Sequence, residues 1–432
     1  MLSERYWGCL VVVSGLCFVL QLYSRQKSSE AAPTASSAAF SSFQSNYLFV
    51  FLLAMLADWL QGPYVYELYV SYGFNQQEIA ELFVCGFGSS MIFGTFIGSM
   101  ADKYGRKKLC VFYALFYITG CITKMFPNYW ILMFGRFLCG IATSLLFSVF
   151  ESWMVCEHFK KGYTSEMLSQ TFSYATFGNG LVAVAAGLTA NAAASSYGYT
   201  APFLLACVPL VIVIVIVSSS WSENYGDQQN SSLSSLMRGF DLIRSDPRIA
   251  ALGLGQSCFE GAMYTFVFMW TPALKTVEET NAEVAGETLD ESTAEFLGII
   301  FATFMVSVMV GSSVFNIAGT SKDNVYSIPL YLHAMAFCTM AIISLFMSNK
   351  FIVYVMFLVF EMSVGLFYPA YGMIKSEKIP EDIRSAVMNI FRIPLNFFVV
   401  ILLLKIKYLT PEAVFQLCTG AHFISLLCYF YF

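Results

Sequence analysis

Four ionisable residues interrupt long apolar stretches of this chain. Asp58 lies in LADWLQGPYVYELY (56–69), Glu260 in FEGAMYTFVFMW, Glu361 in VFEMSVGLF and Arg392 in NIFRIPLN. A charged side chain in an apolar medium needs a partner or a water-filled cavity. These residues therefore mark an interior site where an ion could be bound.

The composition indicates a protein that crosses a membrane many times. The chain has 432 residues, of which 57% are hydrophobic and 12% are charged. Soluble domains carry about 25% charged residues. Its 12 Cys lie mostly inside apolar runs and its 3 His are scattered, so we expect no disulfide framework, no metal site and no cofactor.

Long apolar runs divide the chain into one helix followed by two sets of six. The predicted spans are 6–23, 45–72, 78–101, 108–126, 129–152, 166–191, 200–220, 248–274, 295–317, 326–347, 350–374, 382–407 and 412–432. The expected architecture is thus all-α: an extra N-terminal helix with a Ser/Ala-rich linker (1–44), a six-helix half (45–221), a cytoplasmic loop (222–247) and a second six-helix half (248–432).

Lys and Arg residues predict the orientation, because cytoplasmic loops are enriched in them. With the 102–108 loop in the cytoplasm, the larger basic set falls on that side: Arg25, Lys27, Lys103, Arg106, Lys107, Lys108, Lys160, Lys161, Arg238, Arg244, Arg248, Lys322, Lys375, Lys378 and Arg384. The outer set is Arg5, Lys124, Lys275, Lys350, Lys405 and Lys407. This places the N-terminus outside, the C-terminus in the cytoplasm and the acidic loop 275–294 outside.

The segment GSMADKYGRKK (98–108) resembles the signature loop of the major facilitator superfamily. Gly98 would let two helices approach closely, and Gly105 would permit a tight turn. Asp102 stands where a short loop meets helix ends, and Arg106 is part of the basic cluster that holds the loop in the cytoplasm. The resemblance implies a twelve-helix transporter core.

Two charged residues of the fourth core helix have alternative interpretations. LMFGRFLCGIA (132–142) resembles the arginine-bearing segment of that superfamily. Arg136 either pins this helix to the first core helix or contacts substrate, and the structural role is favoured. Glu151, near the cytoplasmic end of the helix, is either a gate or a helix cap.

Several longer segments are similar to the molybdate-anion transporter family. They are LADWLQGPYVYELY, LLFSVFESWMVCEH (145–158), WSENYG (221–226), FEGAMYTFVFMWTPAL (259–274), EMSVGLFYPAYGMIKSEKIPE (361–381) and MNIFRIPLN (388–396). This resemblance covers the chain from about residue 44 to its end. It implies a plasma-membrane carrier that imports molybdate, a tetrahedral divalent oxyanion.

The four buried charges lie 10 to 14 residues from the ends of their predicted helices, which corresponds to the middle of the bilayer. The superfamily resemblance implies that helices carrying Asp58, Glu260 and Glu361 line a central cavity, with the helix of Arg392 beside them. Asn389 shares a helix face with Arg392, so an amide and a guanidinium could bind an oxyanion together. Asp58 is similarly spaced from Gln61, with Tyr64 one step further along.

Three acids around one or two arginines make a poor site for a dianion. Protonation of Glu260, Glu361 or Asp58 would remove the conflict, so the charges favour proton-coupled uptake. No motif distinguishes this mechanism from uniport or anion exchange. Asp58 or Glu361 could instead neutralise Arg392 or Arg136 in a structural ion pair.

Other functions remain as alternatives. The same fold could carry sulfate, an organic anion or a sugar, and a non-transporting receptor or scaffold is the weaker alternative. An enzyme is not expected, because the chain has no phosphate-binding glycine loop, nucleophile elbow or metal cluster. We expect a monomer in the bilayer, without a nucleic-acid partner.

The orientation can be tested with an epitope tag at position 285. We expect antibody to reach the tag in intact cells, because the charge bias places this loop outside. A tag at position 225 should be reached only after permeabilisation. The reverse pattern would show that the orientation is wrong.

Overall fold

The computed structural model describes residues 2–28, 38–226, 232–285, 293–318 and 322–432. All regular elements in this part of the chain are helices, which confirms the all-α class. The α-helices are α1 (Leu2–Ser28), α2 (Ala38–Gln61), α3 (Val65–Ser71), α4 (Gln76–Tyr104), α5 (Arg106–Thr123), α6 (Tyr129–Leu146), α7 (Val149–Lys160), α8 (Ser165–Tyr197), α9 (Ala201–Ser220), α10 (Ser232–Ser245), α11 (Pro247–Ala285), α12 (Leu297–Ala318), α13 (Lys322–Leu345), α14 (Lys350–Lys378), α15 (Glu381–Leu404) and α16 (Pro411–Tyr431). Short 3-10 helices are η1 (Gly62–Tyr64), η2 (Thr293–Phe296) and η3 (Ile406–Tyr408).

Many of these helices can cross a membrane. Within the described ranges, eleven segments are long and apolar enough: Glu4–Ser24, Ala38–Ser71, Gln76–Ile97, Tyr129–Lys160, Ser165–Tyr197, Ala201–Ser220, Thr293–Ala318, Ser327–Leu345, Lys350–Lys378, Val387–Leu404 and Pro411–Tyr431. Two other predicted spans, 108–126 and 248–274, overlap α5 and α11, which are not among the eleven. The chain is therefore a multi-pass membrane protein.

Helical structure extends into two segments that the sequence analysis treated as loops. The outer loop expected at 275–294 is helical through Ala285, where α11 ends, and residues 286–292 lie outside the described part. The loop expected at 222–247 contains α10. Leu242 and Ile243 of α10 pack against a core of Ile249, Ile379, Ile383, Val387 and Phe391. Tertiary packing thus stabilises a helix in a segment whose composition looked polar.

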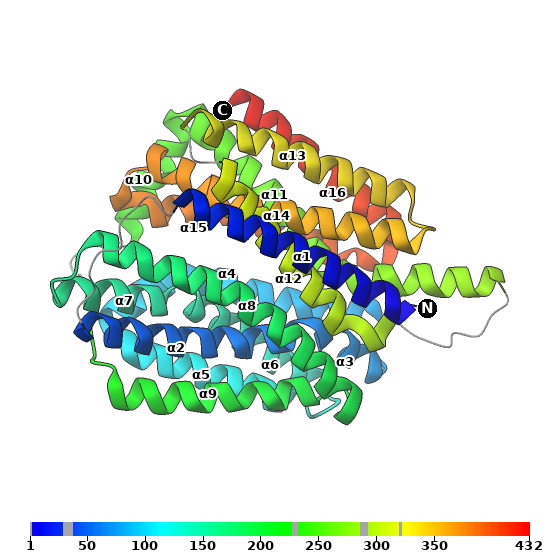
Figure 1. The fold of residues 1–432 in the computed structure, drawn as a ribbon, viewed down its shortest axis with the longest axis horizontal. Coiled ribbons are helices and arrows are strands. Elements are labelled where there is room, and N and C mark those ends of the chain that lie inside the picture. The colour runs from blue at the N-terminus through cyan, green and yellow to red at the C-terminus, as the bar shows by residue number, and fades with distance from the viewer. Residues whose placement is uncertain (1, 29–37, 227–231, 286–292, 319–321) are drawn as a thin grey trace. The chain divides into compact units, whose positions relative to one another are not determined.

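The first compact unit contains Met1–Glu30, Asn75–Val84 and Leu233–Phe432. In it α11 packs against α14, α15 and α16, while α12 and α13 pack against α14. Helix α1 packs against α12 and so belongs to this unit (Figure 1). The second unit contains Ala31–Phe74 and Cys85–Ser232, where α2 packs against α8 and α9, and α5 against α6, α7 and α9.

One face of α1 makes the contact with its unit. Tyr6, Leu10 and Cys17 are buried, whereas most other described side chains of this helix are exposed. The Tyr6 ring lies 5.0 Å from that of Tyr354 and 5.7 Å from that of Phe296. Aromatic pairs at this separation are favourable. They fix the N-terminal end of α1.

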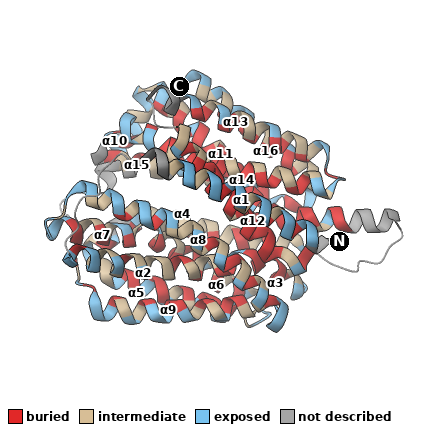
Figure 2. Ribbon diagram, in the orientation of Figure 1, coloured by how far each residue is buried: buried red, intermediate tan, exposed pale blue. Residues whose placement is uncertain are grey.

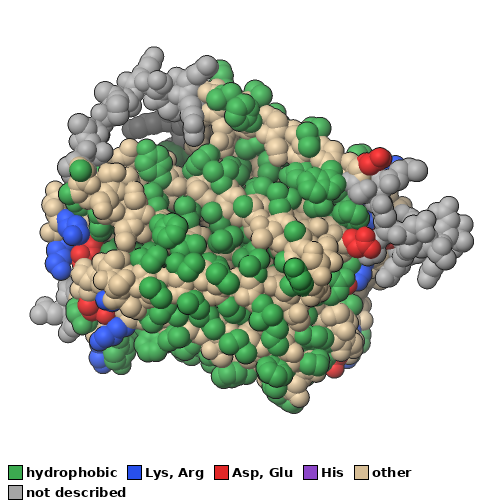
Figure 3. Space-filling model, turned by 60° about the horizontal axis from the view of Figure 1, so that its bottom comes forward, with side chains coloured by type: hydrophobic (Ala, Val, Ile, Leu, Met, Phe, Trp, Pro, Cys, Tyr) green, Lys and Arg blue, Asp and Glu red, His purple; other side chains and the backbone are tan. Residues whose placement is uncertain are grey.

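Buried and exposed side chains are distributed as in a membrane protein. Buried residues are concentrated in α11, α12 and α14 (Figure 2). On the face shown in Figure 3, hydrophobic side chains cover the middle and charged side chains lie near the margins. Large apolar side chains such as Trp130 and Val215 are exposed because lipid would surround them.

Two glycines allow α12 and α14 to approach closely. A Cβ atom added at Gly311 would overlap the carbonyl oxygen of Met362, and one added at Gly365 would overlap that of Val308. Close backbone approach through small residues is a common way for membrane helices to associate. The two glycines thus set the distance between these helices.

Gly365→Val should destabilise the protein, because backbone cannot move aside for the new side chain. Overpacking of this kind costs about 1–3 kcal/mol. We expect a lower melting temperature of the detergent-purified protein. Gly372→Val on the same helix is the control, since a Cβ added there meets nothing within 4 Å. Equal melting temperatures for the two variants would contradict the close contact.

Candidate functional site

The first cluster of interior charges lies where α11 crosses α15. Ser257 of α11 donates a hydrogen bond to the backbone oxygen of Phe391, 2.6 Å away. Gly253 and Gly261 of α11 face the rings of Phe391 and Phe398. Because Ser257 and Phe391 meet, Glu260 and Arg392 occupy the same crossing.

Helix α14 completes this cluster from another side. The rings of Phe259 and Phe367 stack with centroids 4.1 Å apart. The Tyr368 hydroxyl donates to the Met263 sulfur at 3.5 Å. Residues of α11 next to Glu260 in the sequence therefore make two contacts with α14 and one contact with α15.

Glu260 is buried, with 8% of its surface exposed, and its carboxylate accepts a hydrogen bond from Gln256 Nε2 at 3.2 Å. Lys375 of α14 and Arg392 of α15 both act on it electrostatically. Arg392 is exposed and Asn389, three residues earlier, is partly buried. The structure therefore brings together the predicted residues Glu260 and Arg392, and it adds Lys375.

Glu361 lies apart from these cations. It is buried, and among the described residues it forms no hydrogen bond or ion pair. Its charge acts on Tyr368 of the same helix. Of the predicted acids in this unit, Glu260 joins the cationic cluster and Glu361 does not.

A second cluster surrounds Asp58 in the other unit. The Tyr117 hydroxyl of α5 donates a short hydrogen bond to Asp58 Oδ1 and lies 3.1 Å from Thr143 Oγ1 of α6. Three helices therefore meet at this carboxylate. The ion pair of Asp58 or Glu361 with an arginine, considered above, stays a prediction.

Lys124 is the buried cation of this second cluster. It is 2% exposed, and its ammonium group donates to Gln61 Oε1 at 3.1 Å and to Gly120 O at 3.4 Å. It also acts electrostatically on Asp58. Lys is rarely buried without partners, so Gln61 and Asp58 offset its charge.

Other predicted residues have contacts that favour packing. Tyr64 is buried and donates to Asn191 Oδ1 of α8 at 3.0 Å. The Arg136 guanidinium lies beside Gly86 of α4, where an added Cβ atom would be 3.0 Å from Nη2. Arg136 thus packs α6 against α4, and it also acts electrostatically on Tyr69 of α3, which lies in the span predicted as the first core helix.

Glu151 is exposed in the first turn of α7. A carboxylate in this position interacts favourably with the helix dipole. Ser148 is the N-cap residue of α7, in the break between α6 and α7, and its side chain makes no capping hydrogen bond. Glu151 therefore lies where a carboxylate can stabilise a helix start, and its role as a gate or a cap stays a prediction.

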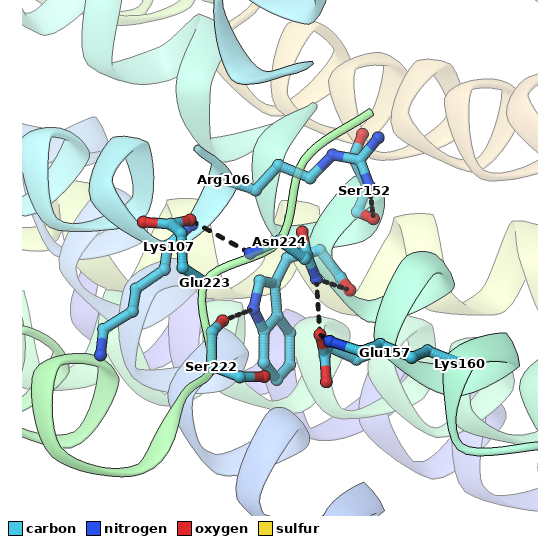
Figure 4. Close-up of polar contacts among 9 residues, drawn as sticks. Arg106, Lys107, Ser152, Glu157, Lys160, Ser222, Glu223 and Asn224 are labelled. Atoms are coloured by element: carbon cyan, nitrogen blue, oxygen red, sulfur yellow. Dashed lines mark hydrogen bonds and ion pairs between the residues drawn. The ribbon is translucent and has the colours of Figure 1, made fainter. Parts of the chain in front are cut away.

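The signature loop is held at the start of α5 by polar contacts (Figure 4). Arg106 Nη2 forms an ion pair with Asp102 at 2.8 Å, and Nη1 donates to the backbone oxygen of Ser152 at 3.1 Å. Gly105 has φ +103°, a conformation that favours glycine. Gly98 lies in α4, but its surroundings are outside the described part.

Glu223, from the segment WSENYG, caps α5. Its carboxylate accepts a hydrogen bond from the backbone N–H group of Lys107 at 2.8 Å (Figure 4). It accepts a second one from the backbone N–H group of Lys108 at 3.3 Å. Asn224 Nδ2 in turn donates to Glu157 Oε1 at 3.2 Å. The carboxylate satisfies helix-start donors and complements the positive end of the dipole.

Sequence reasoning missed Lys124, Lys375 and Glu223. Both lysines stand close to helix ends, and so they were assigned to the outer and cytoplasmic loops. Their long side chains reach other helices, and one sequence alone does not reveal that direction. Glu223 was part of a quoted segment, but the helix start that it caps is far away in the chain.

Comparisons with known proteins agree on the kind of protein. A family model described as sugar transporters with 12 transmembrane segments matches residues 6–366. The chain is 34% identical over 423 residues to the molybdate-anion transporter of Xenopus laevis, covering 93% of this chain and 88% of that protein. It is 33% identical over 450 residues to the molybdate-anion transporter of Xenopus tropicalis, covering 99% and 94%.

Solved structures of two transporters share the fold. A variant of the nucleoside transporter NupG has a TM-score of 0.72 at 11% identity and covers 89% of this chain and 99% of its own. The peptide transporter POT in complex with sulfate has a TM-score of 0.68 at 13% identity and covers 90% and 93%. At these identities the likeness concerns the fold alone.

Glu223→Ala should destabilise the protein, because two N–H groups at the start of α5 lose their acceptor. Loss of a capping side chain costs about 0.5–2 kcal/mol. We expect a lower melting temperature, and a smaller decrease for Glu223→Gln, which keeps one carbonyl oxygen. Asp241→Ala, on the exposed surface of α10, is the control. A Glu223→Ala protein as stable as this control would rule out the capping role.

Proposed function

Because the chain belongs to the molybdate-anion transporter family of the major facilitator superfamily, we propose that it is a secondary active transporter that takes up molybdate by alternating access. It is a multi-pass membrane protein, and its relatives are transporters. The identity to these relatives extends over nearly the whole chain, which supports a shared substrate. Uptake would occur at the plasma membrane.

The observation that carries the proposal is that Arg392 of α15 lies near the buried Glu260. Asn389 is on the same face of α15 as Arg392. A guanidinium offers two parallel donors to a tetrahedral oxyanion, and the amide adds another. Arg392 is exposed, so its charge is available to a solute. We assign substrate binding first to Arg392 and Asn389.

The second cluster has a supporting role in the proposal. Asp58, Gln61 and Tyr64 are its predicted contributors to substrate binding. Asp58, Glu260 and Glu361 are the candidate proton sites, because each is an acid inside a membrane-spanning helix. Binding of a divalent anion near an ionised carboxylate is unfavourable, which favours uptake together with protons.

The topology in the proposal is the one that charge indicates. An extra N-terminal helix precedes two six-helix halves, the N-terminus is outside and the C-terminus is cytoplasmic. The protein acts as a monomer. The basic signature loop at 102–108 supports this orientation.

Uptake of labelled molybdate tests the function. Cells that lack their own molybdate carrier should accumulate the label when they express this chain. Sulfate and a sugar serve as competitors. Full competition by sulfate at equal concentration would favour a general oxyanion carrier, and competition by the sugar would favour the sugar alternative. No uptake by protein present at the cell surface would overturn the proposal.

Arg392→Ala should abolish uptake, and Arg392→Lys should lose most of it, because an ammonium group cannot reproduce the paired donors. Loss of a charged hydrogen-bond partner costs about 2–4 kcal/mol, or roughly 30- to 1,000-fold in affinity. Arg244→Ala, in α10, is the control. Normal uptake by Arg392→Ala at the cell surface would require a site built on other cations.

A further inference from the structure

Lys375 gives the first cluster a second cation. It lies in the last turn of α14, yet its side chain is partly buried and acts electrostatically on both Glu260 and Arg392. Among the described residues, its ammonium group forms no hydrogen bond and no ion pair. A partly buried cation without a direct partner is costly, so this group is suited to bind an anion.

Three elements orient the cluster around one carboxylate. The contact of Ser257 with Phe391 brings α15 to α11, and the stacked rings of Phe259 and Phe367 bring α14 to α11. Lys375 follows Phe367 by two helical turns, and Arg392 follows Phe391 directly. Two cations from two different helices therefore share the neighbourhood of Glu260.

The formal charges of the cluster match a dianion in one protonation state. Lys375 and Arg392 contribute two positive charges, and an ionised Glu260 cancels one of them. When Glu260 is protonated, a divalent tetrahedral oxyanion would neutralise the two cations. When Glu260 is ionised, the same oxyanion would leave an excess negative charge in a poorly solvated place.

We propose that Lys375 is the second cationic ligand of the transported dianion, and that Glu260 is the internal counter-ion that protonation removes to make way for it. This inference rests on the proposed function and specifies its coupling. The proton comes from water and binds the Glu260 carboxylate. It leaves again when the substrate has dissociated, so no covalent bond to the oxyanion forms.

Gln256 can serve Glu260 in both states. Its Nε2 donates to the carboxylate at 3.2 Å, and its Oε1 is buried without a partner among the described residues. After protonation of Glu260, rotation of the amide would present Oε1 as the acceptor for the new O–H group. The pair therefore stays hydrogen-bonded whether or not Glu260 carries a proton.

Besides three tyrosines, the titratable groups around Glu260 include His422 of α16 and His333 of α13, whose rings lie 5.2 Å and 5.7 Å from that of Phe259. His333 also lies 2.7 Å from the Tyr371 hydroxyl. Tyr264 is on the same helix, and Tyr368 and Tyr371 face Glu260 from α14. Arg392 acts on Glu260 from α15, and Ser425 of α16 donates to Gly255 O of α11 at 2.7 Å and lies 3.0 Å from His333 Nδ1. Glu260→Gln removes the carboxylate and leaves these groups in place, so a pH effect that this variant loses reports on Glu260.

Calorimetric binding of molybdate to the full-length protein in detergent tests the inference. Wild type should bind more weakly as pH rises from 5.5 to 8, with at most about a tenfold change per pH unit for one proton. Glu260→Gln should bind tightly at every pH, because the amide imitates the neutral acid. Lys375→Met should weaken binding at pH 5.5 by roughly 10- to 100-fold, since a charged contact is lost.

Two further variants keep the result interpretable. Lys375→Arg retains the charge and should restore most of the affinity and the pH dependence, even if Lys375→Met folds poorly. Lys378→Met, in the same last turn of α14, is the matched control and should bind as wild type does. Glu260→Gln provides a second test that does not depend on Lys375 variants.

The possible results distinguish a failure of the proposed function from a failure of the inference about Lys375 and Glu260. Wild-type protein that binds neither molybdate nor sulfate would overturn the proposed function and this inference with it. Normal wild-type binding together with unchanged affinity in Lys375→Met would overturn only the inference. The same holds if Glu260→Gln retains the pH dependence of wild type.

Discussion

The cost of charge in an apolar interior is the constraint on which the rest of this structure depends. An ion removed from water loses several kcal/mol of solvation, which close partners must return. Each compact unit meets this requirement with its own residues. In one unit Lys124 is bonded to Gln61 near Asp58, and in the other Glu260 stands near two cations. The helices around these groups are arranged to keep them close.

The packing of the helices therefore also determines where the charged groups lie relative to one another. The contact of Ser257 with Phe391 fixes the crossing of two helices and thereby the distance between an acid and a guanidinium. Tyr117 plays the comparable part at Asp58, since its hydroxyl joins α5 to α2. The same logic holds at the signature loop, where Glu223 neutralises the start of α5. Charges at helix ends and charges inside helices are thus both placed close to groups that stabilise them.

Sequence reasoning predicted what depends on local pattern. Apolar runs predicted the helices, and the signature loop with Asp102 and Arg106 predicted the superfamily. It failed where a side chain acts at a distance from its backbone. Lys375 looked like a loop cation because its backbone is near a helix end, and α10 looked like loop because its packing partners are remote in the chain. Glu361 matched Glu260 in pattern, yet the structure separates their surroundings.

The isolation of Glu361 has an electrical consequence. A dianion that enters a cell moves against a negative interior, and each unit of charge costs about 2.3 kcal/mol per 100 mV. One proton carried on Glu260 would leave one negative charge to be moved, so membrane voltage would oppose uptake. A second proton on Glu361, held outside the cationic cluster, would make the translocated set electroneutral. Under the proposed coupling, protonation of Glu361 would therefore decide whether the carrier responds to voltage or only to the proton gradient.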